Sequence, residues 1–577
     1  MNNNLVTTSI NETFSESSNN ILLGDWCYPY LNKKSNFKIK KLKFHWDSID
    51  KKENDYKYLE NLYYKILRAL TLSFNLYHST EKTERYWHII IGPFLINFLQ
   101  VFWDRWENIR VAFENEKINE TKIINLNYED CVCSEFLPLF ALSNNNQFWN
   151  HFIYANIINF LQPKNLKIIN IKADSYKASI LRKKNKSKSI ISSKKFIDLI
   201  LSKIFKNEKI VFYKSYIEKE KFIKLSLKLK QIPRIYCELD KSIDNIPKLN
   251  REKFKLNINP SNKFESFLET ILIKVLPCSY LENYAETIEE VRKIKLNPKI
   301  IYTAIGHTVD DYFKFWSAEQ VMKGTKYIVS DHGGYIDDKQ NFGAWSKFSD
   351  LYLRWNLDKK KNTLQMPPSI LFKDQDFIKS NSNKILLLGN NTQLYPKKVQ
   401  SATQSGQIIR DVELWENFYN KLDNEKKVFF KFRTHVTDDW NIGNFFSNKY
   451  GKNILSKYKR INDDLKTSKI IINTSFSTPF FETIYSGKPT IILSLEKFFS
   501  ISEEKKQLLI DLSKNKILFD NADNALNHLN KIWDNIDDWW NSKEIVKTKE
   551  KFHELCFIKK KNEINFWKDF FLSQLKI

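Results

Sequence analysis

The chain has 577 residues, 42% of them apolar and 15% aromatic, so it can bury a substantial core and is too long for a single one. This composition excludes a disordered protein, and the apolar runs are far shorter than the roughly 18 residues of a membrane-spanning helix. The net charge of +25 comes largely from lysines accompanied by abundant Asn and Ile, and by itself it does not indicate nucleic-acid binding.

The cysteines and the first residues both bear on the location of the protein. The six cysteines are scattered, and the spacing of Cys131 and Cys133 is not that of a zinc or thioredoxin site. The first twenty residues are rich in Asn, Ser and Thr and lack the basic start and apolar core of a secretory signal. We therefore expect a cytoplasmic protein with reduced thiols, which could also work at the inner face of the membrane.

The first elements expected along the chain are a strand and a long helical region. Leu22-Leu-Gly-Asp-Trp26 predicts a strand that ends in a turn, with Asp25 at its carboxyl end. Apolar residues recur at helical spacing from about residue 55 to 114, and the most apolar part, residues 92–103, predicts a core helix. The arginine of Trp103-Asp-Arg-Trp106 is expected to be buried and paired with a carboxylate. The pattern between about residues 125 and 290 is mixed and basic.

Strands and helices alternate clearly from residue 299 onward. Residues 300–304, 326–330 and 351–355 are short apolar runs typical of buried parallel strands. Between the first two runs, residues 310–322 predict an amphipathic helix that Gly324 closes.

Candidate catalytic residues lie at the ends of these strands. Asp331 and His332 follow the second run, and an imidazole at a strand end suits a general base near neutral pH. Gly333 and Gly334 let the backbone approach a ligand closely. His307, in the turn after the first run, joins Asp331, His332 and Asp25 as a catalytic candidate. The alternative is a histidine that only stabilises its turn.

The stretch from residue 469 to 493 predicts a complete strand–loop–helix–strand unit. Residues 469–472 and 489–493 are β-branched apolar runs, Pro479 suits the first turn of a helix, and Gly487 suits a left-handed cap after it. In open α/β sheets, ligands bind where such a loop leaves a strand and enters a helix.

Hydroxyl groups and cations gather around that loop and at the end of the preceding strand, residues 427–432. An arginine at a strand end matches phosphate bidentately, and hydroxyls with helix N–H groups complete an anion site. The alternative is a generic turn in which Ser and Thr act as caps. The candidate donor-binding residues are Gly333, Gly334, Arg433, His435, Thr474, Ser475, Ser477, Thr478 and Glu482.

Together the elements predict an α/β protein with two Rossmann-like domains facing across a cleft, a helical insertion in the N-terminal half and a C-terminal helical tail. The expected parts are an N-terminal catalytic domain (residues 1–360), a linker (361–383), a domain for a phosphate-linked donor (384–535) and the tail (536–577); the resemblance given next implies that the first domain binds the acceptor and that the third part is a nucleotide-sugar-binding domain. No Walker loop, G-x-G-x-x-G or metal-ligand cluster occurs in the sequence, so neither a cofactor nor a metal is expected.

Several motifs resemble the transferases of bacterial surface-polysaccharide (O-antigen) loci. They are Leu23-Gly-Asp-Trp-Cys27, His45-Trp46, Arg85-Tyr-Trp87 with Ile91-Gly-Pro93, Asp331-His-Gly-Gly334, the unit from Thr474 to Pro489, and Trp539-Trp540. More distantly, the chain is similar to capsule Kdo transferases and to GT-B bacterial sialyltransferases. The resemblance implies a metal-independent glycosyltransferase in which His435 and the Thr474-Ser475 loop hold the CMP of an acidic sugar donor. Val436 stands where those relatives have the proline of a His-Pro pair.

The partners expected are therefore a nucleotide-sugar donor and a glycan or lipid-linked acceptor, without nucleic acid. Two alternatives remain open: a UDP-sugar epimerase with the same two-domain cleft, and a binder of nucleic acid or anionic membrane. The second would use the basic cluster from Arg182 to Lys188, which otherwise predicts an exposed loop or linker.

Overall fold

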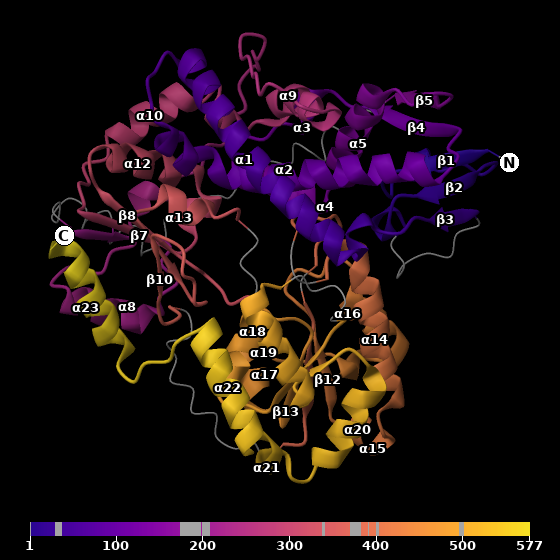
Figure 1. Ribbon diagram of the computed structural model, residues 1–577, viewed down its shortest axis with the longest axis vertical. Coiled ribbons are helices and arrows are strands. Elements are labelled where there is room, and N and C mark those ends of the chain that lie inside the picture. Colours follow the sequence, from indigo (N-terminus) through magenta and orange to yellow (C-terminus); the bar gives the residue numbers. More distant parts are fainter. Residues whose placement is uncertain are drawn as a thin grey trace.

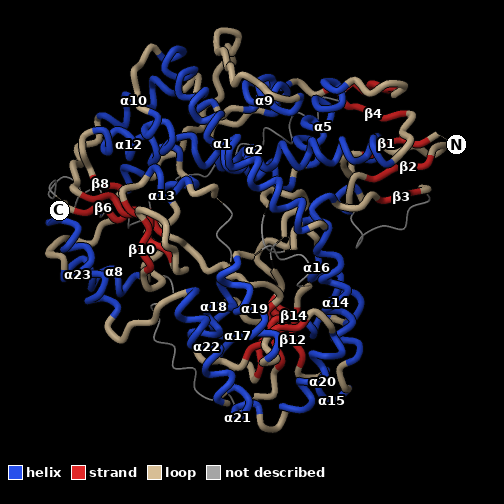
Figure 2. The backbone as a smooth tube through the Cα atoms, in the orientation of Figure 1, coloured by secondary structure: helices blue, strands red, loops and turns tan. Residues whose placement is uncertain are grey.

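The structure is a computed structural model. In the part of the chain that the structure describes, the strands form three separate parallel sheets of five strands each, shown in red in Figure 2. The α/β class with parallel sheets predicted from the sequence is confirmed. The basic cluster of residues 182–188 lies outside the described residues, which are 2–28, 37–172, 198, 208–336, 341–369, 382–390, 392–399, 403–495 and 501–576.

The first sheet was not predicted from the sequence. Its strand order is β3-β2-β1-β4-β5, and the expected strand at residues 22–26 ends earlier, at Leu22. Asn4 is fully buried in β1, where its Nδ2 donates to the carbonyl of Thr13 and to Oδ1 of Asn20, both at 2.9 Å. The strands are β1 (Asn3–Val6), β2 (Asn19–Leu22), β3 (Ile39–Lys41), β4 (Glu120–Asn125) and β5 (Lys167–Lys172).

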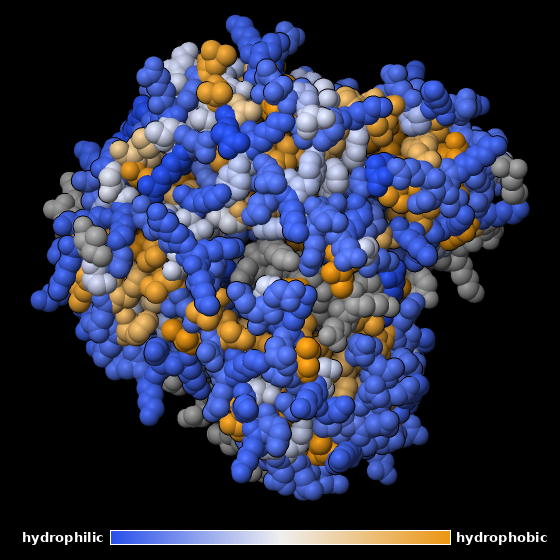
Figure 3. Space-filling model, in the orientation of Figure 1, coloured by the Kyte–Doolittle hydropathy of each residue, from blue (hydrophilic) through white to orange (hydrophobic). Residues whose placement is uncertain are grey.

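Long helices between β3 and β4 pack against helices that cover both the first and the second sheet. In Figure 1, α2 runs across the upper part of the molecule towards the first sheet. Among the described residues, α2 is the one helix long and apolar enough to cross a membrane, and 94% of its most apolar stretch is buried in the protein, so the predicted core helix is confirmed. Figure 3 shows a mostly hydrophilic outer face. The helices here are α1 (Ile49–His78), α2 (Glu84–Asn115), α3 (Tyr128–Cys131), α4 (Phe136–Asn145), α5 (Gln147–Leu161), α9 (Lys263–Val275) and α10 (Tyr284–Arg292).

The second sheet has the order β10-β9-β8-β7-β6. Its last strand, Thr363–Gln365, pairs with β9, so the predicted linker of residues 361–383 begins inside this sheet. The strands are β6 (Ile210–Phe212), β7 (Ile300–Thr303), β8 (Lys326–Ser330), β9 (Leu351–Arg354) and β10 (Thr363–Gln365). The helices are α8 (Lys219–Lys228), α11 (Gly306–Val309), α12 (Asp311–Met322) and α13 (Ala344–Phe348).

The third sheet has the order β12-β11-β13-β14-β15 and contains the predicted strand–loop–helix–strand unit, with Gly487 left-handed at φ 73° as expected. The strands are β11 (Ile385–Leu388), β12 (Phe430–Arg433), β13 (Ile470–Asn473), β14 (Thr490–Leu493) and β15 (Leu518–Phe519). The helices are α14 (Ile408–Lys421), α15 (Asn424–Lys427), α16 (Ile442–Tyr450), α17 (Ile461–Lys466), α18 (Thr478–Tyr485), α19 (Glu503–Lys514) and α20 (Ala522–Ile532).

The C-terminal helices are α21 (Ile536–Trp540), α22 (Lys543–Cys556) and α23 (Glu563–Lys576), and they contact two sheets. On α22, the ring of Phe552 packs 5.0 Å from that of Phe481 beside the third sheet. On α23, the ring of Phe571 lies 5.0 Å from Phe212 and 5.4 Å from Tyr302 of the second sheet. The chain therefore returns from the third sheet to the second, as the yellow helix α23 in Figure 1 shows.

Candidate functional site

The carboxyl edges of the second and third sheets meet. The turn after β8, residues 331–335, touches the loop after β13, residues 474–478. The backbone N–H of Gly334 donates to Oγ1 of Thr478 at 3.1 Å, and Tyr335 and Ser477 form an antiparallel bridge. The structure thus brings together the two segments in which most of the candidate residues lie, although these contacting residues are 144 positions apart in the sequence.

The two glycines of the turn make this contact possible. A Cβ atom on Gly333 would lie 2.6 Å from Oγ1 of Thr478, and one on Gly334 would lie 2.5 Å from the ring of Phe481. Both distances are too short for any larger residue without movement. The glycines were predicted to approach a donor. Their close neighbour is instead the beginning of α18, so their role is to let the two sheets meet.

Asp331, a predicted catalytic residue, has its carboxylate occupied by protein partners. Its buried carboxylate accepts hydrogen bonds from the hydroxyl of Tyr335 at 2.7 Å, from the hydroxyl of Tyr352, and from the backbone N–H of Trp355 at 3.1 Å. The guanidinium of Arg354 lies 3.8 Å away. A carboxylate with these partners holds the turn in place and is not open to a substrate.

His332 is the exposed member of the turn. Its ring lies 5.8 Å from that of Tyr216 in an edge-to-face arrangement. Partial desolvation by the neighbouring protein lowers the pKa of His332 from its usual 6.5, while the Asp331 carboxylate raises it and the Lys398 ammonium lowers it. The imidazole is therefore mostly neutral near pH 7 and can accept a proton.

The other two catalytic candidates lie elsewhere. His307 is 2% exposed and packs edge-to-face on Trp345 at 4.9 Å, and burial lowers its pKa to about 3, so it is a neutral core residue behind the turn. Asp25 pairs with Lys41 at 2.6 Å, and its carboxylate is so close to the backbone of Gly406 that a Cβ there would lie 2.6 Å away. Burial raises the pKa of Asp25. Its contacts therefore belong to the packing of the first sheet against the segment before α14.

The hydroxyl groups of the loop after β13 are occupied by protein partners. Thr474 donates to the carbonyl of Leu388 at 2.8 Å, and Ser475 donates to the hydroxyl of Ser477 at 2.9 Å. Thr478 accepts from the turn of the second sheet, as described above. The predicted anion site at the start of α18 is therefore largely filled by the protein itself. Glu482 lies half-buried further along the same helix.

Arg433, a predicted donor-binding residue, has its guanidinium bound to protein partners. Its Nη1 donates to Asp464 at 2.5 Å and to the carbonyl of Tyr458 at 2.7 Å, and its Nη2 donates to the carbonyl of Lys459 at 2.9 Å. Asp464 is fully buried, so it needs this partner. The arginine fork is used to organise the segment before α17.

His435, two residues beyond β12, remains exposed. Its Nδ1 accepts from the backbone N–H of Thr437 at 3.2 Å. Partial burial lowers the pKa of His435, the Thr437 hydrogen bond and the Asp439 carboxylate raise it, and the nearby Lys397 ammonium lowers it. Of the candidates at this strand end, His435 is the one whose side chain is open to a ligand.

Lys397 and Lys398 complete the site and were missed by the sequence analysis. They follow β11, whose carboxyl end lies at the same edge as those of β12 and β13. Burial lowers the pKa of Lys397 to about 7 and that of Lys398 to about 8. The charge of Lys398 lowers the pKa of His332 and that of Lys397 lowers the pKa of His435, so each lysine lies near one of the two imidazoles. We call His332, Lys398, Lys397 and His435 the inter-sheet site.

The signal that could have identified these lysines was a cationic pair soon after a buried strand. It was overlooked because the chain has 92 lysines and arginines. Arg105, fully buried and paired with Asp104 at 2.6 Å as predicted, also reaches this segment, since its Nη1 donates to the carbonyl of Pro396 at 2.6 Å. No sequence pattern links residues 291 positions apart.

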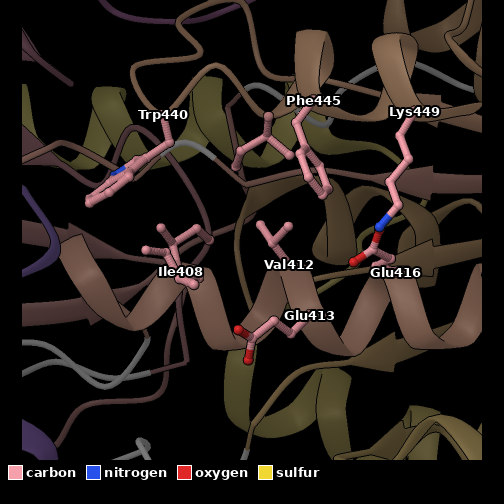
Figure 4. A pocket seen from close by; sticks show the side chains of 9 residues that line it. Ile408, Val412, Glu413, Glu416, Trp440, Phe445 and Lys449 are labelled. Atoms are coloured by element: carbon pink, nitrogen blue, oxygen red, sulfur yellow. The ribbon is translucent and has the colours of Figure 1, made fainter. Parts of the chain in front are cut away.

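Three hollows of the described protein lie away from the inter-sheet site. Figure 4 shows one between α14 and α16, where Trp440 and Phe445 face Ile408 and Val412, and its volume is about 100 Å³. Ligand pockets usually have roughly 300–1,000 Å³. Two larger surface hollows, of about 550 and 490 Å³, lie beside β4 and beside the α1–α2 pair. Among the described residues, no group of three or more His, Cys, Asp or Glu side chains could hold a metal ion.

Comparison with known proteins identifies a family. The sequence matches the model described as LIC12162 family transferase over residues 3–571. No curated protein matches the chain.

The solved structures it resembles include Staphylococcus aureus MnaA bound to UDP (11% identity, 63% of this chain, 97% of that chain, TM-score 0.33) and Anabaena HepE with UDP and glucose (10%, 64%, 100%, 0.33). Acinetobacter baumannii MurG is a third (10%, 64%, 99%, 0.32). These TM-scores are too low to support a conclusion about this chain.

Proposed function

The chain belongs to the LIC12162 family of transferases, and from this premise we propose that it is a glycosyltransferase that moves a sugar from a nucleotide-activated donor to a hydroxyl group. The observation that supports this proposal most is the contact of Gly334 with Thr478, which joins the carboxyl edges of two parallel sheets. Ligands of open α/β sheets bind at such edges. At this one, an exposed imidazole stands beside two lysines.

In the proposed reaction, His332 acts as the general base. Its neutral imidazole takes the proton of the acceptor hydroxyl while the oxygen attacks the anomeric carbon of the donor sugar. The bond between that carbon and the donor phosphate oxygen breaks, and the electron pair leaves with the nucleotide. Cations of the inter-sheet site stabilise the charge that develops on the leaving phosphate. Asp331 keeps the His332 turn in position through its hydrogen bonds to Tyr335 and Tyr352.

The biological setting follows from the resemblance in sequence. We propose that the enzyme builds bacterial surface polysaccharide of the O-antigen type, in the cytoplasm or at the inner face of the membrane, with a glycan or lipid-linked acceptor. A CMP-linked acidic sugar is the donor that the resemblance implies, and a nucleoside diphosphate sugar is the other candidate. We propose that the reaction needs no metal, because lysines and histidine at the site can stabilise the leaving group.

A thermal-shift screen tests the donor. CMP, UDP, GDP and their sugars are added to the full-length protein, and a nucleotide that binds only the folded state raises the melting temperature. The nucleotide sugar that shifts the melting temperature is then incubated with a hydroxyl acceptor, with and without EDTA, and the product is followed by mass spectrometry. We expect the rate of sugar transfer to be the same with and without EDTA. Isomerisation of the donor sugar without transfer would show an epimerase instead.

The role of His332 is tested by His332→Ala. Loss of the general base should lower turnover by about a hundredfold or more and leave nucleotide affinity close to that of the wild type. His528→Ala, which removes an imidazole from α20 outside the inter-sheet site, is the matched control. Equal turnover in the two variants would remove His332 from the mechanism.

A further inference from the structure

We propose that Lys397 and Lys398 form a diphosphate-binding pair, which makes the donor a nucleoside diphosphate sugar. This inference rests on the proposed function and specifies its donor class. In the transfer step, the bond between the anomeric carbon and the terminal phosphate oxygen breaks, and its electron pair goes to the diphosphate. The two ammonium groups receive that added negative charge.

The first argument is that the other cation and donor groups at this edge already have partners. Arg433 is held by Asp464, and Thr478 accepts the N–H of Gly334. Within the described part of the chain, no ion pair of 4.0 Å or less involves Lys397 or Lys398, and the Asp439 carboxylate acts on Lys397 only from further away. Two lysines with no closer carboxylate at a sheet edge leave positive charge for a ligand to neutralise.

The second argument is that the protein fixes the backbone on both sides of the pair. The carbonyl of Pro396 accepts from Nη1 of Arg105 at 2.6 Å, and the N–H of Val399 donates to Oε1 of Gln100 at 2.8 Å. Arg105 and Gln100 are fully buried on α2. Burying polar groups is costly unless they are hydrogen-bonded, so these two contacts hold residues 397 and 398 in one place.

The third argument is that each lysine lies near one of the two imidazoles. The charge of Lys398 lowers the pKa of His332, beside the second sheet, and the charge of Lys397 lowers that of His435, beside the third. The charge of Lys398 also lowers the pKa of Lys397, so the two positive charges are close to each other. Two neighbouring phosphates match this arrangement better than the single phosphate of a CMP-linked donor.

The titration of the pair supports this geometry. Burial lowers the pKa of both lysines into the range where an ammonium group loses part of its charge near neutral pH. A bound diphosphate would raise both pKa values by its negative charge. The groups that face the pair are His332, His435 and Asp439, with the ring of Phe140 5.9 Å from Lys397. Binding should therefore take up protons.

Calorimetry with inorganic pyrophosphate tests the inference on the full-length protein. Wild type should bind pyrophosphate more tightly than phosphate, with proton uptake measured near pH 7.5 from buffers of different ionisation enthalpy. The double variant Lys397→Gln/Lys398→Gln should lose pyrophosphate affinity by about tenfold or more. Lys426→Gln/Lys427→Gln is the matched control, because it removes an adjacent, half-buried lysine pair from α15, before β12 at the opposite edge of the third sheet.

The outcomes separate this inference from the proposed function. Pyrophosphate that fails to bind wild type, or that binds the 397/398 variant equally well, overturns the diphosphate pair. Lysine-dependent pyrophosphate binding without sugar transfer from any nucleotide sugar would uphold the pair and refute the glycosyltransferase. If the 397/398 variant transfers sugar from a CMP-sugar at the wild-type rate, the glycosyltransferase is upheld and the diphosphate pair is refuted.

Discussion

Replacing Lys397 by Met should make the protein more stable. In the folded state the pKa of Lys397 is about 7 instead of its ordinary 10.5, so the folded state disfavours the ammonium form. At about 1.4 kcal/mol for each pH unit, this difference corresponds to an upper limit of about 5 kcal/mol below pH 7. Because the side chain is only half-buried and the surroundings can relax, we expect roughly 2 kcal/mol.

The sign of the pH dependence follows from the same difference. Below pH 7 both states carry the proton and the cost is complete. Between pH 7 and 10.5 the unfolded state binds more protons than the folded state, so the stability of wild type rises with pH. The advantage of Lys397→Met should therefore be largest near neutral pH and shrink as the pH increases.

Urea unfolding followed by tryptophan fluorescence, at about pH 6.5 and about pH 9, measures this advantage. Lys427→Met on α15 is the control and should show no comparable gain. A stabilising substitution that abolishes pyrophosphate binding would mark Lys397 as a residue kept for function at a cost in stability. A less stable Lys397→Met protein, or a gain that grows with pH, would refute the reasoning.

Three further predictions test other parts of the site. The turnover of wild type should fall on the acid side with a midpoint below pH 6.5, because the base must be neutral and the pKa of His332 is lowered; a midpoint above 6.5 would exclude it. Arg433→Gln should lower the free energy of unfolding by about 1–3 kcal/mol, because Asp464 loses a charged partner, with nucleotide affinity unchanged by calorimetry. Gly334→Ala should cost about 1–3 kcal/mol and most of the turnover, because its Cβ would overlap the ring of Phe481; wild-type melting temperature and rate would contradict the packing described.

The sequence predicted the parts of the fold in which local signals and burial agree. The run 326–330 is β8, and the unit around Pro479 and Gly487 has the expected order of elements. The first sheet was not predicted because its strands carry buried amides, such as Asn4 and Asn20, whose hydrogen bonds cannot be read from an apolar pattern. The strand expected at 427–432 starts later, since Lys427 ends the short helix α15.

The candidate site was predicted in its location and only partly in its chemistry. Strand ends identified the segments of His332 and Thr478 correctly as neighbours of a common edge. Which polar groups remain free there depends on tertiary partners: Arg433 has Asp464, and Asp331 has two tyrosine hydroxyls. Such partners come from distant parts of the chain. Sequence reasoning could therefore place a site, while the structure was needed to separate its structural groups from its exposed ones.

The return of the C-terminal helices to the second sheet restricts how the part of the protein around the second sheet can move relative to the part around the third. The polypeptide crosses between them once after β10 and again between α22 and α23, and the N–H of Leu357 donates to the carbonyl of Leu555 at 2.9 Å near the second crossing. Gly334 and Thr478 join the same two sheets at a further point, so any opening between them must strain both chain connections at once. Removing α23 would take away the contacts of Phe571 with Phe212 and Tyr302 and so loosen one of the two connections.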